Sequence, residues 1–203
     1  MIGIIIGTGP SLNDSAEAVR ELQGSGALLF GCNNTYQDFR LDVWLACDPA
    51  WHEHYGRIDI PHCDQWHWDA DICDRYGYKY IEGRWFDGLS PVGSKWISFN
   101  HCSGAQLLNL ATSIYECETV LLVGHDFRYP AGKPRHYFTG LSETAGEYPQ
   151  KIRKFSKFSK PDGDDLMEVY RHIAQQEGLP PIYNCTPGSA LEWFQVAELE
   201  DYL

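Results

Sequence analysis

A glycine-rich segment near the start of the chain has the composition of a phosphate-binding turn. The apolar residues 2–6 run directly into Gly7, Thr8, Gly9, Pro10 and Ser11. Where such a turn joins a strand to a helix, its backbone N–H groups can approach a phosphate. The dinucleotide fingerprint would have a third glycine where Leu12 stands, and Pro10 removes a donor N–H group. The turn therefore predicts a nucleotide-containing ligand other than NAD.

Polar residues also follow other apolar runs of the chain. Asn33 and Asn34 carry amides that can donate hydrogen bonds to phosphate or ribose oxygens. Asp48 and Asp126 carry carboxylates that can accept from ribose hydroxyls, orient a base or hold Mg²⁺. Because ligands of open parallel sheets bind outside the carboxyl ends of the strands, we expect these four residues and Thr186 to line one cleft.

The elements that must position these residues alternate between short apolar runs and helical patterns. The predicted strands are residues 2–6, 27–31, 43–47, 120–123 and 182–184, and the predicted helices are residues 14–22, 104–115 and 164–176. This alternation is typical of a parallel sheet covered by helices. The sequence predicts an α/β fold, a Rossmann-like three-layer sandwich with a mainly parallel central sheet, as a single domain over residues 1–203.

Two segments depart from this alternation. Residues 51–96 are rich in tryptophan and tyrosine, and we expect an irregular insertion whose aromatic side chains either pack onto the sheet or line an acceptor pocket. Residues 130–163 are polar, basic and rich in glycine and proline. A loop of this length inside a compact domain is more often a lid or a binding loop than a simple connection.

Composition limits the partners. The 203 residues carry a formal net charge of −12, which disfavours nucleic acid and anionic membranes except at a local basic patch such as residues 151–160. No apolar run approaches the ~20 residues of a membrane span, and a chain that starts with a strand has no signal peptide, so we expect a cytoplasmic protein. The seven cysteines form no C-x-x-C pair, so we expect them to be structural. A metal site at His52, His54, His62 and His67, beside Cys63 and Asp64, is the less favoured interpretation because these residues have no recognisable ligand spacing.

Five short motifs occur in a characteristic order: G-T-G-P-S-L from Gly7, G-C-N-N from Gly31, Ser103-Gly104, L-L-V-G-H-D-F from Leu121 and C-T-P-G-S-A-L from Cys185. Over nearly the whole chain this order resembles the Rossmann-like bacterial sialyltransferases that modify lipooligosaccharide. It is also similar to the archaeal 6-hydroxymethyl-dihydropterin pyrophosphokinases, and most similar to small proteins of phages and prophages. The resemblance implies a transferase with a nucleotide-activated donor, in a bacterial or phage-infected host cytosol.

The sialyltransferase resemblance implies metal-free transfer from a CMP- or UDP-linked sugar, with a glycan as the favoured acceptor. Gly7, Gly9, Pro10 and Ser11 would border the donor, Asn33 would contact its phosphate or ribose, and Ser103 and Gly104 would bind its base-sugar side. Tyr129 and Tyr137 would stabilise the departing phosphate. Residues 159–165 lack the histidine that this family uses as general base, and His136 is the best substitute.

The pyrophosphokinase resemblance implies a different reaction. The sialyltransferases have an asparagine where this chain has Asp48, whereas the pyrophosphokinase-like branch has Asp-Pro, as here. This match implies Mg²⁺-dependent diphosphate transfer from ATP, with Asp48 and Asp126 holding the metal and Lys133, Arg135 or Lys160 neutralising the developing charge.

Two further alternatives remain. The missing histidine favours a non-catalytic nucleotide-binding module. The likeness to phage proteins suggests a transferase that modifies a DNA base, with residues 151–160 along the DNA backbone. We favour glycosyl transfer over diphosphate transfer, and both over these two; the sequence is also compatible with an oligomer.

Overall fold

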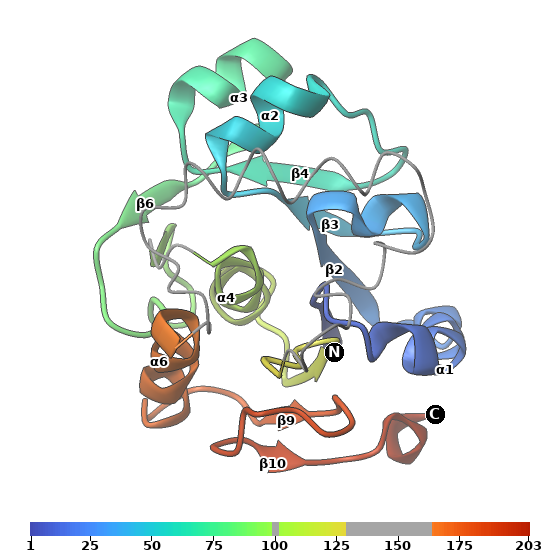
Figure 1. Cartoon of the computed structure of the whole chain (residues 1–203). Coiled ribbons are helices and arrows are strands. Elements are labelled where there is room, and N and C mark those ends of the chain that lie inside the picture. The colour runs from blue at the N-terminus through green and yellow to red at the C-terminus, as the bar shows by residue number, and fades with distance from the viewer. Residues whose placement is uncertain (99–101, 129–163) are drawn as a thin grey trace.

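The computed structural model describes residues 1–98, 102–128 and 164–203, and its centre is a sheet of eight parallel strands (Figure 1). The strand order is β10-β9-β8-β1-β2-β3-β4-β5, and two further strands, β6 and β7, pair in parallel as a second sheet. The strands are β1 (Ile2–Ile6), β2 (Leu28–Cys32), β3 (Val43–Leu45), β4 (Asp64–His67), β5 (Lys79–Tyr80), β6 (Glu82–Arg84), β7 (Trp96–Ser98), β8 (Thr119–Val123), β9 (Ile182–Asn184) and β10 (Gln195–Val196).

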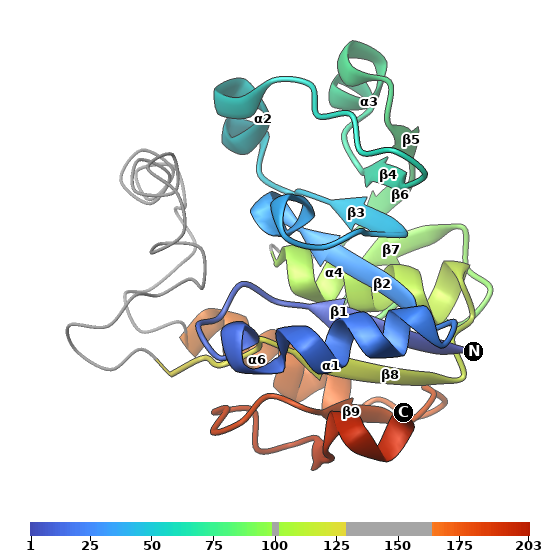
Figure 2. The same ribbon diagram turned by 90° about the vertical axis from the view of Figure 1, so that its right-hand side faces the viewer.

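Helices cover both faces of the large sheet, with α1 on one face and α4 and α6 on the other (Figures 1 and 2). The helical segments are α1 (Leu12–Gly24), the 3₁₀ turn η1 (Asn33–Gln37), α2 (Pro49–Tyr55), α3 (Ala70–Tyr76), α4 (Ser103–Asn109), the π-helical turn η2 (Leu110–Ile114), α6 (Asp164–Ala174) and the 3₁₀ turn η4 (Leu199–Tyr202). The α/β fold with a parallel sheet, predicted from the alternation of elements, is confirmed.

The chain changes its direction across the sheet between β1 and β8. Strands β2 to β5 are added on one side of β1, and β8 then returns to the other side, so that Ile5 of β1 pairs with both Phe30 and Leu122. Parallel crossovers are right-handed, which places α1 and α4 on opposite faces once the direction changes. In open parallel sheets the carboxyl end of such a switch point is where ligands bind.

The sheet is buried on both faces, which explains its continuous apolar runs. Side chains alternate along a strand, so Ile4 and Ile6 pack into the layer that holds α1 whereas Ile5 packs into the layer that holds α4. All three side chains are fully buried. The α1 layer also holds Trp44 and Trp51, and the α4 layer holds leucines of α4 together with α6.

The predicted strands and helices match observed elements to within a few residues. The strand predicted over 27–31 is β2, and the helix predicted over 104–115 is α4 continued by the π-helical turn η2. Residues 51–96, expected to be irregular, instead contain α2, β4, α3, β5, β6 and β7, and β4 and β5 extend the parallel sheet. Their strands are short and most of their residues are partly or fully exposed, so they lack the apolar runs that reveal buried strands.

The lid-like segment 130–163 and the basic run 151–160 lie outside the described residues.

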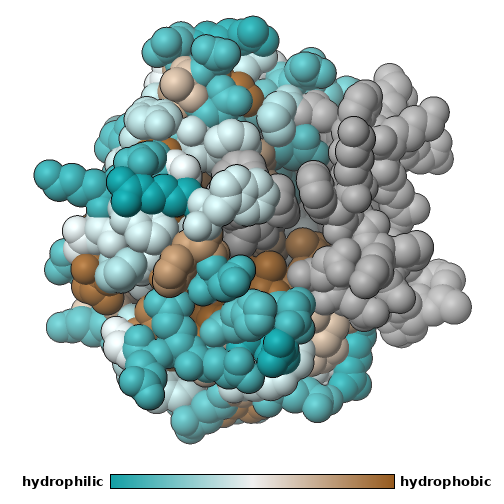
Figure 3. All heavy atoms as spheres, turned by 90° about the vertical axis from the view of Figure 1, so that its left-hand side faces the viewer, coloured by the Kyte–Doolittle hydropathy of each residue, from teal (hydrophilic) through white to brown (hydrophobic). Residues whose placement is uncertain are grey.

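The face over β6 and α6 is largely hydrophilic, with apolar side chains exposed near its middle (Figure 3). Exposed large apolar residues of the described chain include Trp85 and Phe86, directly after β6. None of the helices in the described ranges is long and apolar enough to cross a membrane.

Candidate functional site

The glycine turn after β1 packs directly against the loop that follows β8. Gly7 N–H donates to Val123 C=O at 2.7 Å, and Gly9 N–H donates to Gly124 C=O at 2.8 Å. A Cβ atom at Gly9 would lie 2.6 Å from the backbone oxygen of Gly124 and 1.8 Å from Oδ2 of Asp126, so only glycine permits this approach. The glycines that suggested a phosphate turn are thus required by packing within the chain.

Asp126 joins the β8 loop to the start of α1. Ser11 donates to this carboxylate twice, from N–H to Oδ1 at 3.2 Å and from Oγ to Oδ2 at 2.7 Å. Burial raises the pKa of Asp126, the two hydrogen bonds from Ser11 oppose that rise, and the nearby Asp14 carboxylate adds to it. The structure therefore brings together Ser11 and Asp126, two of the predicted site residues.

His125, which precedes Asp126, follows β8 at the edge where the sequence predicts the cleft, but the sequence analysis gave it no role. Its side chain is only 4% exposed, and Nδ1 lies 3.1 Å from Val123 C=O. Since a carbonyl oxygen only accepts, Nδ1 carries the proton and Nε2 is left as a buried acceptor, with no hydrogen-bond partner among the described residues. The signal available in the sequence was its place between Gly124 and Asp126, directly after a strand.

Burial lowers the pKa of His125 from its ordinary value of 6.5 to about 4, so the ring is a neutral acceptor at neutral pH. The unfolded chain takes up this proton below pH 6.5 but the folded chain does so only near pH 4. The free energy of unfolding should therefore fall by up to roughly 3 kcal/mol between pH 6.5 and pH 4 on account of His125. Urea denaturation at a series of pH values measures this loss.

A substitution that cannot titrate should flatten the same pH dependence. His125→Gln should lose less stability than the wild type between pH 6.5 and pH 4, whereas His54→Gln, at an exposed position of α2, should follow the wild-type curve. Equal slopes for His125→Gln and the wild type would contradict the assignment. His67, whose pKa burial also lowers to about 4, contributes in the same window and stays unchanged in both variants.

Ser103 and Gly104 form the start of α4 and hold it against the sheet. Ser103 Oγ donates to Cys47 Sγ at 3.1 Å and accepts from Cys47 N–H at 3.2 Å, which ties α4 to the end of β3. A Cβ atom at Gly104 would lie 2.6 Å from the hydroxyl of Tyr170 and 3.0 Å from Nε2 of His125. Burial raises the pKa of the Cys47 thiol to about 12, so this thiol stays protonated and is a poor nucleophile.

Asn33 and Asn34 follow β2 as predicted but differ in what they can do. Asn34 is buried, accepts from Nε1 of Trp51 at 2.9 Å and donates to the hydroxyl of Tyr55 at 3.1 Å. Both ends of its amide group are therefore used in hydrogen bonds to α2. Asn33 has a left-handed backbone with φ of 49° and a partly exposed side chain, while its carbonyl accepts from Nε1 of Trp44. Of the two amides, Asn33 is the one placed to meet a ligand.

The remaining predicted site residues fall into three groups. Thr186 is buried and structural, because its hydroxyl accepts from His125 N–H at 3.0 Å and donates to Leu122 C=O at 3.2 Å. Thr8, Pro10 and Asp48 are partly exposed at the carboxyl ends of β1 and β3. The third group lies outside the described residues and consists of residues predicted to act in catalysis or to neutralise charge: Tyr129, His136, Tyr137, Lys133, Arg135 and Lys160.

Asp48 and Asp126 follow two strands that lie far apart in the sheet. Asp48 follows β3 and Asp126 follows β8, and three strand spacings separate β3 from β8, which is roughly 14 Å. A single Mg²⁺, with ligands about 2 Å away, would have to draw both carboxylates far from these strand ends. No group of three or more His, Cys, Asp or Glu side chains suited to a metal occurs among the described residues, and all seven cysteines are free.

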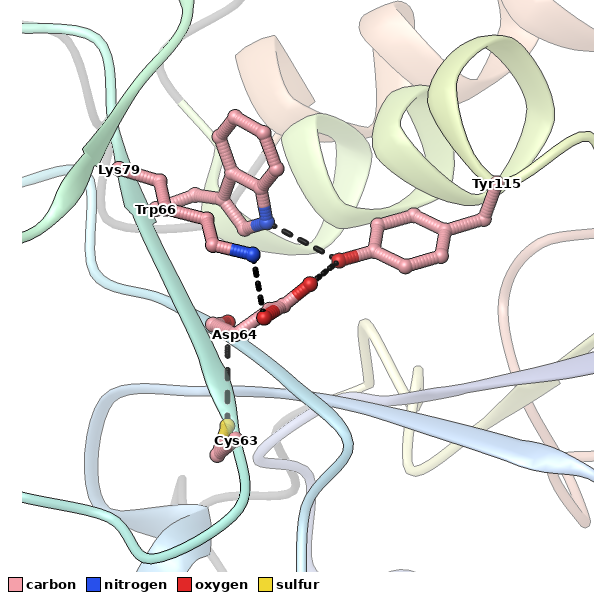
Figure 4. A network of polar contacts seen from close by, with 5 residues as sticks. All are labelled: Cys63, Asp64, Trp66, Lys79 and Tyr115. Carbon is pink, nitrogen blue, oxygen red and sulfur yellow. Dashed lines mark hydrogen bonds and ion pairs between the residues drawn. The ribbon is translucent and has the colours of Figure 1, made fainter.

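A further network of polar contacts lies at the start of β4 (Figure 4). The Asp64 carboxylate pairs with Nζ of Lys79 at 2.5 Å and accepts from the hydroxyl of Tyr115 at 2.6 Å, and Trp66 Nε1 donates to that hydroxyl at 3.1 Å. Burial would raise the pKa of Asp64, but the hydrogen bonds from Lys79 and Tyr115 outweigh it and lower that pKa. This network joins β4 and β5 to the residue after η2, at the amino end of the sheet and away from Asp126.

No family model, curated protein or solved structure matches this chain. The parallel α/β fold is therefore what the structure establishes, and the family resemblance stays an expectation from the motifs.

Proposed function

We propose that this chain is a transferase that binds a nucleotide-activated donor at the carboxyl end of the sheet, over β1 and β8. The observation that carries the proposal is the switch point itself, where the strand order changes direction and where Ser11 and Asp126 meet. Parallel α/β sheets bind nucleotides at such points. Asn33, partly exposed at the end of the neighbouring strand β2, supplies an amide at the same edge.

Glycosyl transfer from a CMP- or UDP-linked sugar is the favoured reaction. It needs no metal, which suits an edge whose two predicted carboxylates start from strands three positions apart. Asp126 suits a sugar hydroxyl because a carboxylate has about four acceptor positions and Ser11 uses two of them. The acceptor substrate and its general base belong to the lid residues, with His136 as the candidate base.

Diphosphate transfer from ATP is the second candidate, and Asp126 is again the residue that favours it. Burial and the negative charge of Asp14 raise the pKa of this carboxylate, and a bound cation would lower it. Mg²⁺ commonly binds through one or two protein carboxylates together with substrate phosphates, so Asp126 or Asp48 could each supply a ligand. Mg²⁺ would then neutralise the developing charge on the transferred phosphates.

Thermal unfolding with CMP, UDP, GDP, ATP and NAD, each with and without Mg²⁺, tests the proposal, because a ligand that binds only the folded state raises its melting temperature. Stabilisation by CMP or UDP without metal would support glycosyl transfer. Stabilisation by ATP only with Mg²⁺ would support diphosphate transfer. Absence of any shift would refute the nucleotide site and favour a binding module for another ligand.

The Asn33 side chain should contribute to this binding. We expect Asn33→Gly to weaken the binding of the stabilising nucleotide about tenfold, because it removes the amide while glycine tolerates the φ of 49°. Asn33→Ala would add backbone strain and is the poorer probe. Isothermal titration measures the affinity. Gln37→Ala at the end of the same turn η1 is the control, and an unchanged affinity in Asn33→Gly would remove this residue from the site.

A further inference from the structure

The start of α1, where a nucleotide phosphate would be expected, has no free backbone donors. Gly9 N–H donates to Gly124 C=O and Ser11 N–H to Asp126, while Pro10 has no N–H. The next three N–H groups donate within the turn, to the carbonyls of Gly9, Pro10 and Ser11 at 3.2, 3.4 and 3.0 Å. A phosphate bound by a helix N-terminus needs such N–H groups to point at it. Here each of them already has a partner.

The same position already holds an anion. The Asp126 carboxylate accepts from both donors of Ser11, at the N-terminus of α1, where the helix dipole favours negative charge. Asp14, in the first turn of α1, adds a second carboxylate close enough to raise the pKa of Asp126. A phosphate brought to this point would meet two carboxylates and no free backbone donor, so binding there is electrostatically unfavourable.

Among the described residues, two groups at this end of β8 keep acceptor positions for a ligand or water. Asp126 keeps unused lone pairs. On the opposite face of the sheet, beside Gly104 of α4, Nε2 of His125 is a buried acceptor to which no group of the described residues donates, and the side chain is 4% exposed. A buried polar atom without a partner is costly, so a donor, either water or a ligand group, is expected at Nε2. A ligand that binds at Asp126 must therefore bring hydrogen-bond donors.

We infer that the switch point between β1 and β8 receives the ribose of the nucleotide, with its hydroxyls donating to Asp126, and that the phosphates bind away from the start of α1. This inference rests on the proposed nucleotide site and specifies how the nucleotide lies in it. It reverses the orientation that the glycine turn suggested, since the turn uses its own donors for packing. Asp126 then selects for a ribonucleoside and against a phosphate at the same place.

A cycle of ligand and protein variants tests the inference by isothermal titration. The probes are cytidine, 2′,3′-dideoxycytidine, CMP and the corresponding uridine and adenosine compounds. For the base that binds, we expect the wild type to prefer the ribonucleoside over its dideoxy form at least tenfold. Asp126→Asn should remove most of this preference, while the gain in affinity from nucleoside to nucleotide stays within about threefold of the wild type.

Asp14→Asn is the matched control, because it removes a neighbouring charge and leaves the Asp126 carboxylate in place; it should keep the preference for the ribonucleoside. Two results would overturn the inference and leave the proposed function standing: equal binding of ribonucleoside and dideoxynucleoside to the wild type, or a tenfold larger gain from the phosphate in Asp126→Asn. The first comparison needs only the wild type, so it decides even if Asp126→Asn does not fold. If no nucleotide binds the wild type, the proposed function fails, and the inference fails with it.

Discussion

Gly7→Ala should destabilise the folded protein by roughly 3 kcal/mol, although it adds only one methyl group. A Cβ atom on Gly7 would lie 2.4 Å from the carbonyl oxygen of Gly124, 2.9 Å from its carbonyl carbon and 3.0 Å from Nδ1 of His125. Two of these three atoms belong to the backbone. The clash cannot be relieved by moving a flexible side chain, and Gly7 N–H is itself held by Val123 C=O at 2.7 Å.

Gly24→Ala provides the matched control for this prediction. Gly24 is the last residue of α1, and nothing lies within 4 Å of the position that its Cβ would take. Because alanine favours a helix over glycine by up to about 1 kcal/mol, Gly24→Ala should leave the stability unchanged or raise it. Urea unfolding followed by tryptophan fluorescence measures both variants. Similar midpoints for the two would mean that the turn after β1 is not packed as described.

The contrast between these glycines bears on what a glycine-rich turn means. Gly7 and Gly9 are needed because β1 and β8 end side by side and their following loops touch. That requirement exists without any ligand. A glycine pattern after a first strand therefore predicts close backbone approach, and whether a phosphate or another segment of the same chain is approached depends on the tertiary contacts.

Sequence periodicity predicted the buried part of the sheet well and its outer part poorly. Strand β1 is an unbroken apolar run because both of its faces are covered, and β8 is similar. Strand β4, with the sequence DQWH, has three partly exposed residues and no apolar run, so neither periodicity nor composition distinguishes it from a loop. Its strand character comes from pairing with β3, which a local pattern does not contain.

In the candidate site, too, local patterns predicted some features and tertiary contacts decided the others. Placing Ser11, Asn33 and Asp126 at the carboxyl edge required only the strand boundaries. The pairing of Ser11 with Asp126 joins residues 115 positions apart and follows from the meeting of β1 and β8. The burial of Asn34 against Trp51 likewise depends on how α2 packs, so no local signal separated this amide from that of its partly exposed neighbour Asn33.

Trp51→Ala should be the most damaging substitution in the aromatic-rich segment, with a loss of about 3–5 kcal/mol of folding free energy. The side chain is fully buried, and its ring centroid lies 5.2 Å from that of Trp44 and 4.7 Å from that of Tyr55. Truncation would leave a large cavity in the α1 layer. It would also leave the Oδ1 atom of buried Asn34 without the hydrogen bond that Nε1 of Trp51 donates to it.

Trp85→Ala removes the same side chain from a position that is 75% exposed, and it should change the stability by less than about 0.5 kcal/mol. Trp51→Phe retains a large ring but lacks the Nε1 donor, so its loss should fall between those of the two alanine variants. Chemical denaturation followed by far-ultraviolet circular dichroism suits this series, because the variants differ in tryptophan content. If Trp51→Ala is no more destabilising than Trp85→Ala, Trp51 is not part of the core. That result would favour the alternative that the aromatic side chains of residues 51–96 line a ligand pocket. A large loss in Trp51→Ala alone would instead assign the Trp51 side chain to packing in the core.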